Sequence, residues 1–144
     1  MNVSDIRTIM KLYDRMLESV CHNYQLSKTE ITIINFLQHN PEKDTAVDIV
    51  ELHMLAKSQV SSAVESLIQK GLLARKQDTI DRRRIHLTLL PEAHPITDSI
   101  GIVRKQFHEA ILDGFTDKEI MLSEEFSQRI SQNAKIALGR REQL

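Results

Sequence analysis

The sequence predicts a mainly α-helical fold with one small β-hairpin. Apolar residues recur at three- and four-residue spacing along most of the chain, as they do on one face of a helix. Residues 72–89 differ, because two short alternating runs flank a charged turn there. With 144 residues, of which 41% are hydrophobic, the chain fits one structural domain and is short enough for a partner subunit to complete it.

The first predicted helix covers residues 4–23, with Ser4 or Asp5 as its cap. Residues at helical spacing form one apolar stripe along it: Ile6, Ile9, Met10, Tyr13, Leu17, Val20 and Tyr24. Such a stripe is typical of a helix that packs against another element along its length.

The second predicted helix, residues 28–39, begins at a capping box. The Ser27 oxygen and the Glu30 carboxylate there satisfy backbone N–H groups that have no partner within the helix. Pro41 ends the helix, because proline has no N–H to donate. The helix is apolar nearly all round, at Ile31, Ile33, Ile34, Phe36 and Leu37, so we expect it to be central.

A short helix and a longer one follow. Residues 45–52 form the short one, capped by Thr45 with Asp48, and its inward residues should be Ala46, Ile49, Val50 and Leu52. The longer helix, residues 57–70, ends at Gly71 and follows the helical template at Val60, Ala63, Val64, Leu67 and Ile68. Its other face is polar: Lys57, Gln59, Ser61, Ser62, Glu65 and Gln69.

Two strands, residues 72–76 and 84–89, are expected to form a hairpin with a basic tip. Its buried side should consist of Leu73, Ile85, Leu87 and Leu89.

The net charge of the chain is only -1, yet residues 57–84 hold seven basic and three acidic residues, a net +4 that leaves -5 for the remainder. A basic stripe on an acidic body favours contact with nucleic acid.

The last third of the chain predicts two helices with apolar seams. The first begins at residue 91 or 92, ends at Gly114, and carries a heptad seam of Ile96, Ile100, Val103, Phe107 and Ala110. A capping box, Thr116 with Glu119, starts the second, which frays near Gly139 and carries Ile120, Phe126, Ile130 and Ala137. These seams have no place in a small core, so two-fold assembly through the terminal helices is the economical explanation.

Composition and motifs limit the class of protein. Cys21 is the only cysteine, so no intramolecular disulfide forms, and the N-terminal residues lack the apolar core of a signal peptide. No stretch reaches the roughly 20 apolar residues of a membrane span, so we expect a cytoplasmic protein. The patterns G-x-x-x-x-G-K, H-E-x-x-H and G-x-S-x-G are absent, so we expect neither enzymatic activity nor a cofactor.

With these elements in order, the sequence resembles the MarR family of bacterial transcription regulators over nearly its whole length. The most specific motifs are Val60-Ser61-Ser62, Lys70-Gly71-Leu72-Leu73, Arg75, Asp78, Asp81-Arg82-Arg83 and Leu87-Thr88. The resemblance implies a winged helix-turn-helix that dimerises through its N- and C-terminal helices. It divides one structural domain into an N-terminal dimerisation helix (1–25), a DNA-binding lobe (26–90) and C-terminal dimerisation helices (91–144).

The resemblance also implies which residues contact DNA. The residues that begin the helix in the major groove would be Lys57, Ser58, Gln59, Ser61 and Ser62. Thr45 would lie near phosphate at a helix N-terminus, and Arg82 would enter the minor groove. Further phosphate contacts would come from Arg75, Lys76 and Arg84. Arg83 would brace the hairpin by pairing with Asp78 or Asp81.

Two positions depart from the family pattern. Ala56 stands where the family often has serine, so Ser58 or a shifted start would cap the recognition helix. The glycine usual after the Leu-Thr pair is missing after Leu87-Thr88, which leaves open where the fifth helix begins.

Three other interpretations stay open. The chain could be a winged-helix module that binds protein and not DNA, but the polarised charge favours DNA. Cys21 could sense peroxide, although it lies closer to the second helix than the cysteine of the peroxide-sensing branch, and a half-buried apolar role is favoured. A metal cluster of Cys21, His22 and His108 is disfavoured, because the residues of the zinc-responsive branch are absent, so we expect no metal.

We therefore expect a sequence-specific regulator of transcription, acting as a repressor, that binds double-stranded DNA as a homodimer. Its operator would be a pseudo-palindrome with half-sites about one helical turn apart. The resemblance implies modulation by a small phenolic or anionic effector bound between the DNA-binding lobe and the dimer helices.

Overall fold

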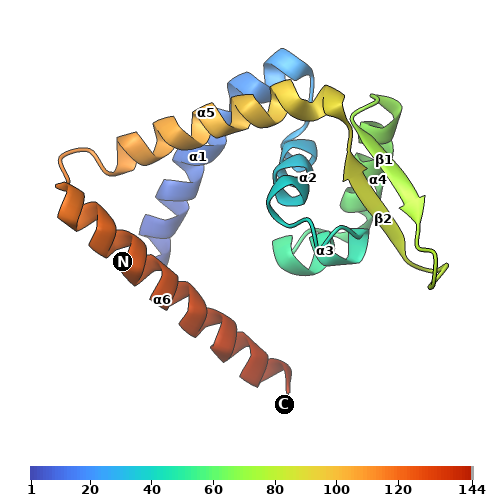
Figure 1. Ribbon diagram of the computed structural model, residues 1–144. Coiled ribbons are helices and arrows are strands. Elements are labelled where there is room, and N and C mark those ends of the chain that lie inside the picture. Colours follow the sequence, from blue (N-terminus) through green and yellow to red (C-terminus); the bar gives the residue numbers. More distant parts are fainter. Residues whose placement is uncertain (144) are drawn as a thin grey trace. The chain divides into compact units, whose positions relative to one another are not determined.

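The computed structural model describes residues 1–143 and confirms the mainly helical fold with one hairpin (Figure 1). Its helices and strands are α1 (Val3–Tyr24), α2 (Lys28–His39), α3 (Ala46–His53), α4 (Lys57–Gln69), β1 (Leu73–Gln77), β2 (Ile85–Leu89), α5 (His94–Ile111) and α6 (Asp117–Glu142). A 3-10 turn, Pro91–Ala93, leads into α5. The strands are antiparallel, in a register that runs from Leu73 opposite Leu89 to Gln77 opposite Ile85.

The chain divides into two compact units. The first unit, Met1–Phe107, holds α1 to α4, the hairpin and most of α5, whereas the second unit begins at His108 and holds the end of α5 and α6. The predicted division into residues 1–25, 26–90 and 91–144 separates regions by their expected roles and not by how compactly they fold. The two compact units do not test it, so it stays a prediction.

The core of the first unit is built around α2. Ile33 and Ile34 have no exposed surface, and Ile31, Phe36 and Leu37 are also buried, which confirms that this helix is central. The helices around it contribute their apolar stripes to the same cluster: Leu17 and Val20 from α1, Ile49 from α3, Val60, Val64 and Leu67 from α4, and Ile96, Ile100 and Val103 from α5.

Four helices begin at capping boxes, in which side chain and backbone exchange hydrogen bonds. The boxes predicted at Ser27, Thr45 and Thr116 are confirmed. The cap predicted for the first helix is wrong, because Asn2 fills this position. Its Oδ1 accepts a hydrogen bond from the Asp5 N–H at 2.9 Å, and the Asp5 carboxylate accepts one from the Asn2 N–H at 2.8 Å.

The helix α4, the predicted recognition helix, begins without a side-chain cap, because its N-cap residue is Ala56. Ser58 does not take over this role, so the prediction of a shifted cap is wrong. The Gln59 side chain partly compensates, since its Oε1 accepts a hydrogen bond from the Ala56 N–H at 3.2 Å.

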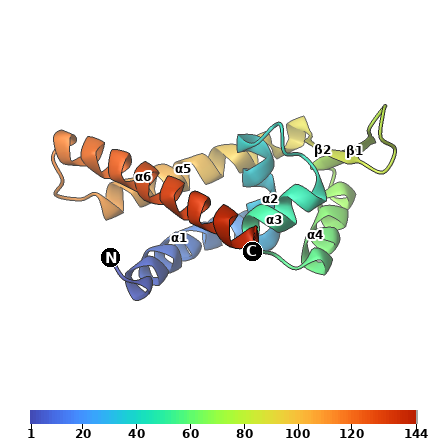
Figure 2. The ribbon, with the colours of Figure 1, turned by 90° about the horizontal axis from the view of Figure 1, so that it is seen from below.

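Several expected inward residues are exposed. In the eight-residue helix α3 only Ile49 is buried and Val50 half-buried, while Ala46 and Leu52 face solvent. Ile85 is 44% exposed, because it starts β2 at the end of the hairpin that projects from the helices (Figures 1 and 2). The last helix does not fray near Gly139 but continues to Glu142, with Arg140 and Arg141 favourably placed at the negative end of its dipole.

A buried carboxylate fixes α4 against the start of α2. Glu30 is only 5% exposed. Its oxygens accept hydrogen bonds from Lys70 Nζ at 3.0 and 3.2 Å, from Ser66 Oγ at 3.1 Å and from the Ser27 N–H at 3.0 Å. Lys70 also donates to the Gln25 carbonyl at 2.9 Å. Burial raises the pKa of Glu30, but its hydrogen bonds with Ser27, Lys70 and Ser66 outweigh this and lower the pKa overall, so the group stays charged.

Replacing Ile33 with alanine should lower the free energy of unfolding by about 2–5 kcal/mol, because it leaves a cavity in the core beneath α4. Urea unfolding at one protein concentration measures the change. Ile80 is 94% exposed, and Ile80→Ala, the matched control, should change stability by no more than about 0.5 kcal/mol. Equal effects of the two substitutions would contradict the burial pattern.

A double-mutant cycle with Glu30→Gln and Lys70→Met should show a coupling of about 1–3 kcal/mol at neutral pH, since each single change leaves a partner without its counter-charge. The Arg15–Glu18 pair on α1, with side chains 67% and 72% exposed, provides the control cycle. Arg15→Met with Glu18→Gln should give a coupling below about 0.5 kcal/mol. Additive effects at Glu30 and Lys70 would mean that this pair does not hold α4.

Candidate nucleic-acid interface

The first two turns of α4 present a polar surface. The side chains of Lys57, Ser58, Gln59, Ser61 and Ser62 are all exposed, while Val60, Ala63 and Val64 between them are buried. The buried residues fix the rotation of the helix about its axis, so the polar residues must face outward. Small hydroxyl and amide side chains at such a surface can approach base edges closely and can both donate and accept hydrogen bonds.

The hairpin carries three consecutive exposed arginines, Arg82, Arg83 and Arg84, next to a turn held by its own hydrogen bonds. The Asp78 Oδ2 accepts from the N–H groups of Ile80 at 3.0 Å and Asp81 at 2.7 Å. The Asp78 N–H donates to the Arg84 carbonyl, and the Arg84 N–H donates to the Asp81 carbonyl. The turn therefore has a defined shape although it projects into solvent (Figure 2).

The two carboxylates proposed as partners of Arg83 have different roles. Arg83 Nε lies 3.4 Å from the Asp81 Oδ1, and the Arg83 N–H donates to the same oxygen at 3.1 Å. With the Arg83 side chain 93% exposed, water screens this pair strongly. Asp78 contacts a different cation, His86, which the sequence interpretation did not include.

His86 lies between two carboxylates. Its Nε2 is 2.7 Å from the Asp78 Oδ1, and its Nδ1 is 2.8 and 3.0 Å from the two oxygens of Asp44. Hydrogen bonds with Asp78 and then Asp44 raise the pKa of His86, and the His86 hydrogen bond, followed by those from the Asp81 and Ile80 N–H groups, lowers the pKa of Asp78 to about 2. Asp44 lies 42 residues from His86 in sequence, so no local pattern could have revealed the contact.

The other predicted phosphate contacts differ in their surroundings. Lys76 and Arg84 are exposed, whereas Arg75 forms an ion pair with Glu65 of α4. The Thr45 hydroxyl donates to the Asp48 carboxylate at 2.7 Å within the capping box of α3. Lys57 and Arg75 also line a hollow of about 450 Å³ that is bounded by α3, α4 and the hairpin and has a largely apolar wall, so this part of the surface is concave.

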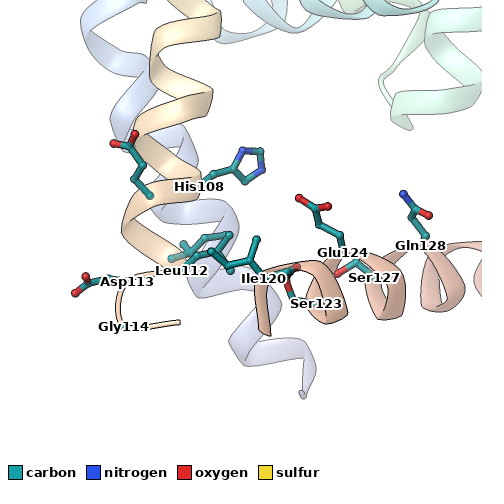
Figure 3. Close-up of a pocket in the computed structure, with 11 residues that line it drawn as sticks. His108, Leu112, Asp113, Gly114, Ile120, Ser123, Glu124, Ser127 and Gln128 are labelled. Atoms are coloured by element: carbon teal, nitrogen blue, oxygen red, sulfur yellow. Dashed lines mark hydrogen bonds between the residues drawn. The ribbon is translucent and has the colours of Figure 1, made fainter. Parts of the chain in front are cut away.

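In the second unit, a hollow of about 820 Å³ lies beside the turn between α5 and α6 (Figure 3). Leu112 and Ile120 form its apolar part, and Glu124 and Gln128 lie along its α6 side (Figure 3). The helix α6 has no buried residue and carries six exposed large apolar side chains: Met121, Leu122, Phe126, Ile130, Ile136 and Leu138. This unit has apolar surface that it does not cover itself.

The remaining candidate sites have little support in the structure. Cys21 is half-buried beside the core, and burial raises the pKa of its thiol, which favours its interpretation as an apolar residue. Within residues 1–143, no three His, Cys, Asp or Glu side chains are grouped so that they could hold a metal ion. Nor does this part of the chain contain a helix long and apolar enough to cross a membrane.

Known proteins with similar sequences are transcription regulators. Residues 24–84 match the model of the MarR family. The chain is 27% identical over 81 residues to the uncharacterized HTH-type transcriptional regulator YsmB of Bacillus subtilis (strain 168), and this match covers 56% of each protein. It is 26% identical over 119 residues to the HTH-type transcriptional regulator PecS of Dickeya dadantii (strain 3937), covering 81% of this chain and 72% of PecS.

The fold is similar to that of solved MarR proteins. The crystal structure of a MarR-family transcriptional regulator from Silicibacter pomeroyi superimposes with a TM-score of 0.75 at 21% identity, covering 89% of this chain and 86% of that one. The hairpin beside α4 is thus the wing of a winged helix fold. Residues 24–84 thus match the MarR family model, both relatives are named as transcriptional regulators, and the fold is that of winged helix proteins of this family, so the chain resembles MarR-type transcription regulators.

Proposed function

We propose that the chain is a sequence-specific transcription regulator that binds double-stranded DNA as a homodimer and acts as a repressor. The observation that carries this proposal is the presence of two exposed surfaces on one compact unit: the polar first turns of α4 and the arginine-rich tip of the wing. A helix that presents small polar side chains fits the major groove, and an adjacent basic hairpin fits the backbone and minor groove.

Charge supports contact with DNA on this side of the molecule. Residues 57–84 carry a net +4 in a chain of net -1, and of the seven basic side chains only Lys70 and Arg75 pair with acidic groups outside the wing turn. Arg82 and Arg84 project from the wing, and Lys57 lies at the start of α4. Phosphate contacts by such residues position a protein on the duplex, while base contacts from α4 would select the sequence.

A homodimer would cover the exposed apolar surface of α6. Leu122, Phe126 and Ile130 recur every four residues and are 38%, 49% and 65% exposed, so they form one stripe. A second copy of the chain offers the same stripe, which suits a two-fold interface. Two recognition helices at a fixed separation would then match the two halves of a pseudo-palindromic operator.

A small-molecule effector would change the distance between the two recognition helices of the dimer. The resemblance to the MarR family supports regulation by a small phenolic or anionic ligand bound near the dimer helices. A ligand that binds the dimer more tightly at one spacing of the recognition helices increases the fraction of dimers with that spacing. The affinity for the operator changes accordingly.

Replacing Arg82 with alanine should weaken binding to operator DNA by about 1–3 kcal/mol, or roughly 5- to 150-fold, because the wing loses its groove contact. Fluorescence anisotropy with duplexes selected from the organism's own DNA measures the change. Arg15 is an exposed arginine on α1, and Arg15→Ala serves as the matched control that should bind as the wild type does. Unchanged affinity in Arg82→Ala would remove this residue from the interface.

The salt dependence of the same measurement tests DNA binding itself. The wild type should lose affinity linearly on a log–log plot against salt concentration, because phosphate contacts release counterions. A slope near zero, or no binding to any selected duplex, would favour a winged-helix module that binds protein instead.

Replacing Ile130 with glutamate should convert the dimer into a monomer, because a charge would be buried in the interface formed by α6. Analytical ultracentrifugation measures the mass, and binding to a two-half-site duplex should fall while the circular dichroism spectrum stays helical. Gln132→Glu introduces the same charge on the polar side of the same helix and should leave the dimer intact. A dimer that survives Ile130→Glu would place the interface elsewhere.

A further inference from the structure

We infer that His86 is a positioning residue for the wing: as an imidazolium it ties the hairpin to the loop before α3, and loss of its proton releases the wing and weakens DNA binding. The consequence for DNA rests on the proposed function. The tie itself is a property of the free protein and can be tested without DNA.

The geometry requires two donors on the ring. Both nitrogens of His86 lie within 2.7–3.0 Å of carboxylate oxygens, from Asp78 on one side and Asp44 on the other. An ionised carboxylate only accepts hydrogen bonds, and neutral imidazole has a single N–H. Only the imidazolium can donate to both neighbours at once. The side chains of His86, Asp44 and Asp78 are 27%, 23% and 25% exposed, so water has limited access to the cluster.

The three residues come from three segments of the first unit: the loop before α3, the wing turn and β2. Asp44 immediately precedes Thr45, the cap of α3, and its carbonyl accepts a hydrogen bond from the Leu87 N–H at 2.8 Å. Asp78 holds the wing turn through the N–H groups of Ile80 and Asp81. His86 on β2 therefore connects the turn beside Arg82 to the helix-turn-helix body.

The charges around His86 set the direction of the pH effect. Asp44 from the loop and Asp78 from the turn favour the proton. Lys76 from β1, the cross-strand neighbour of His86, and Arg84, which directly precedes β2, have the same sign as the imidazolium. The carboxylate hydrogen bonds prevail and raise the pKa of His86 above its ordinary value. The bridge therefore persists to a higher pH than it would with an unperturbed imidazole, and it is lost as the pH rises through the raised pKa. Asp78, with a pKa of about 2, stays ionised throughout this range.

NMR of the DNA-free protein tests the bridge. The ring nitrogens of His86 and the backbone amides of residues 78–84 are followed from about pH 6 to about pH 10. In the wild type the amides should titrate together with His86, because the wing loosens as the proton leaves. In His86→Gln, which keeps a polar side chain but cannot become a cation, the amide shifts should be flat. Wing amides that do not follow His86 in the wild type would overturn the inference.

A second pair of variants keeps the test decisive if His86→Gln does not fold. Asp78→Asn removes one carboxylate and should move the midpoint of the His86 titration to lower pH, together with that of the wing amides. Asp81→Asn removes a neighbouring carboxylate that contacts Arg83 and not His86, and it should leave the midpoint nearly unchanged. Equal midpoints in Asp78→Asn and the wild type would show that this contact does not hold the proton.

Anisotropy with a selected duplex then separates this inference from the proposed function. The wild type should lose affinity by about fivefold or more on the alkaline side, as if a wing contact were removed, while His86→Gln should be weaker throughout and nearly independent of pH. The other five histidines remain in the variant, so the difference between the two curves isolates His86. Parallel curves would overturn the inference, whereas failure of the wild type to bind DNA at any pH would overturn the proposed function and leave the NMR result to decide the bridge.

Discussion

The packing of α4 against α2 is the constraint on which the candidate interface depends. Val60 and Leu67 have no exposed surface, and they meet a helix whose Ile33 and Ile34 are equally buried. Successive residues of a helix point about 100° apart, so a rotation of α4 by one position would bring Ser61 into the core and move Val60 to the surface. Burial of a polar hydroxyl without a partner and exposure of a valine would both cost free energy. The orientation of the polar surface is therefore a consequence of the core, with Glu30 and Lys70 fixing the far end of the helix.

The parts of this fold that could be predicted from sequence depend on local chemistry. The boxes at Ser27, Thr45 and Thr116 involve residues three apart, and the stripe of α4 repeats over thirteen residues, so both are visible in a short window. The failures have a different cause. Ala46 and Leu52 have the right spacing for burial, but α3 packs mainly against α4 and leaves its other sides exposed. Ile85 lies at the edge of a hollow and is only partly covered. The spacing of apolar residues predicts which face of a helix or strand points inward. It does not predict whether a neighbouring element extends far enough to cover that face.

The polar contacts of the site were less predictable, because each charged side chain had several partners within reach. Asp78 could have paired with Arg83, but it accepts from His86, and Arg75 meets Glu65 on the adjacent helix. These choices follow from the hairpin register and from the position of the loop that carries Asp44, and the sequence specifies neither locally. The residue types of the interface could thus be predicted, but the network that holds them could not.

The wing is attached to the rest of the first unit in two ways. At its base, Leu73 and Leu87 join the hydrophobic core. Further out the attachment is polar, through Asp44, His86 and Asp78. The tip with Arg82 and Arg83 is held by hydrogen bonds within the hairpin itself. Attachment therefore weakens from base to tip. The base of the hairpin is thus held beside α4, while the polar contacts of the middle section determine how far the tip can move.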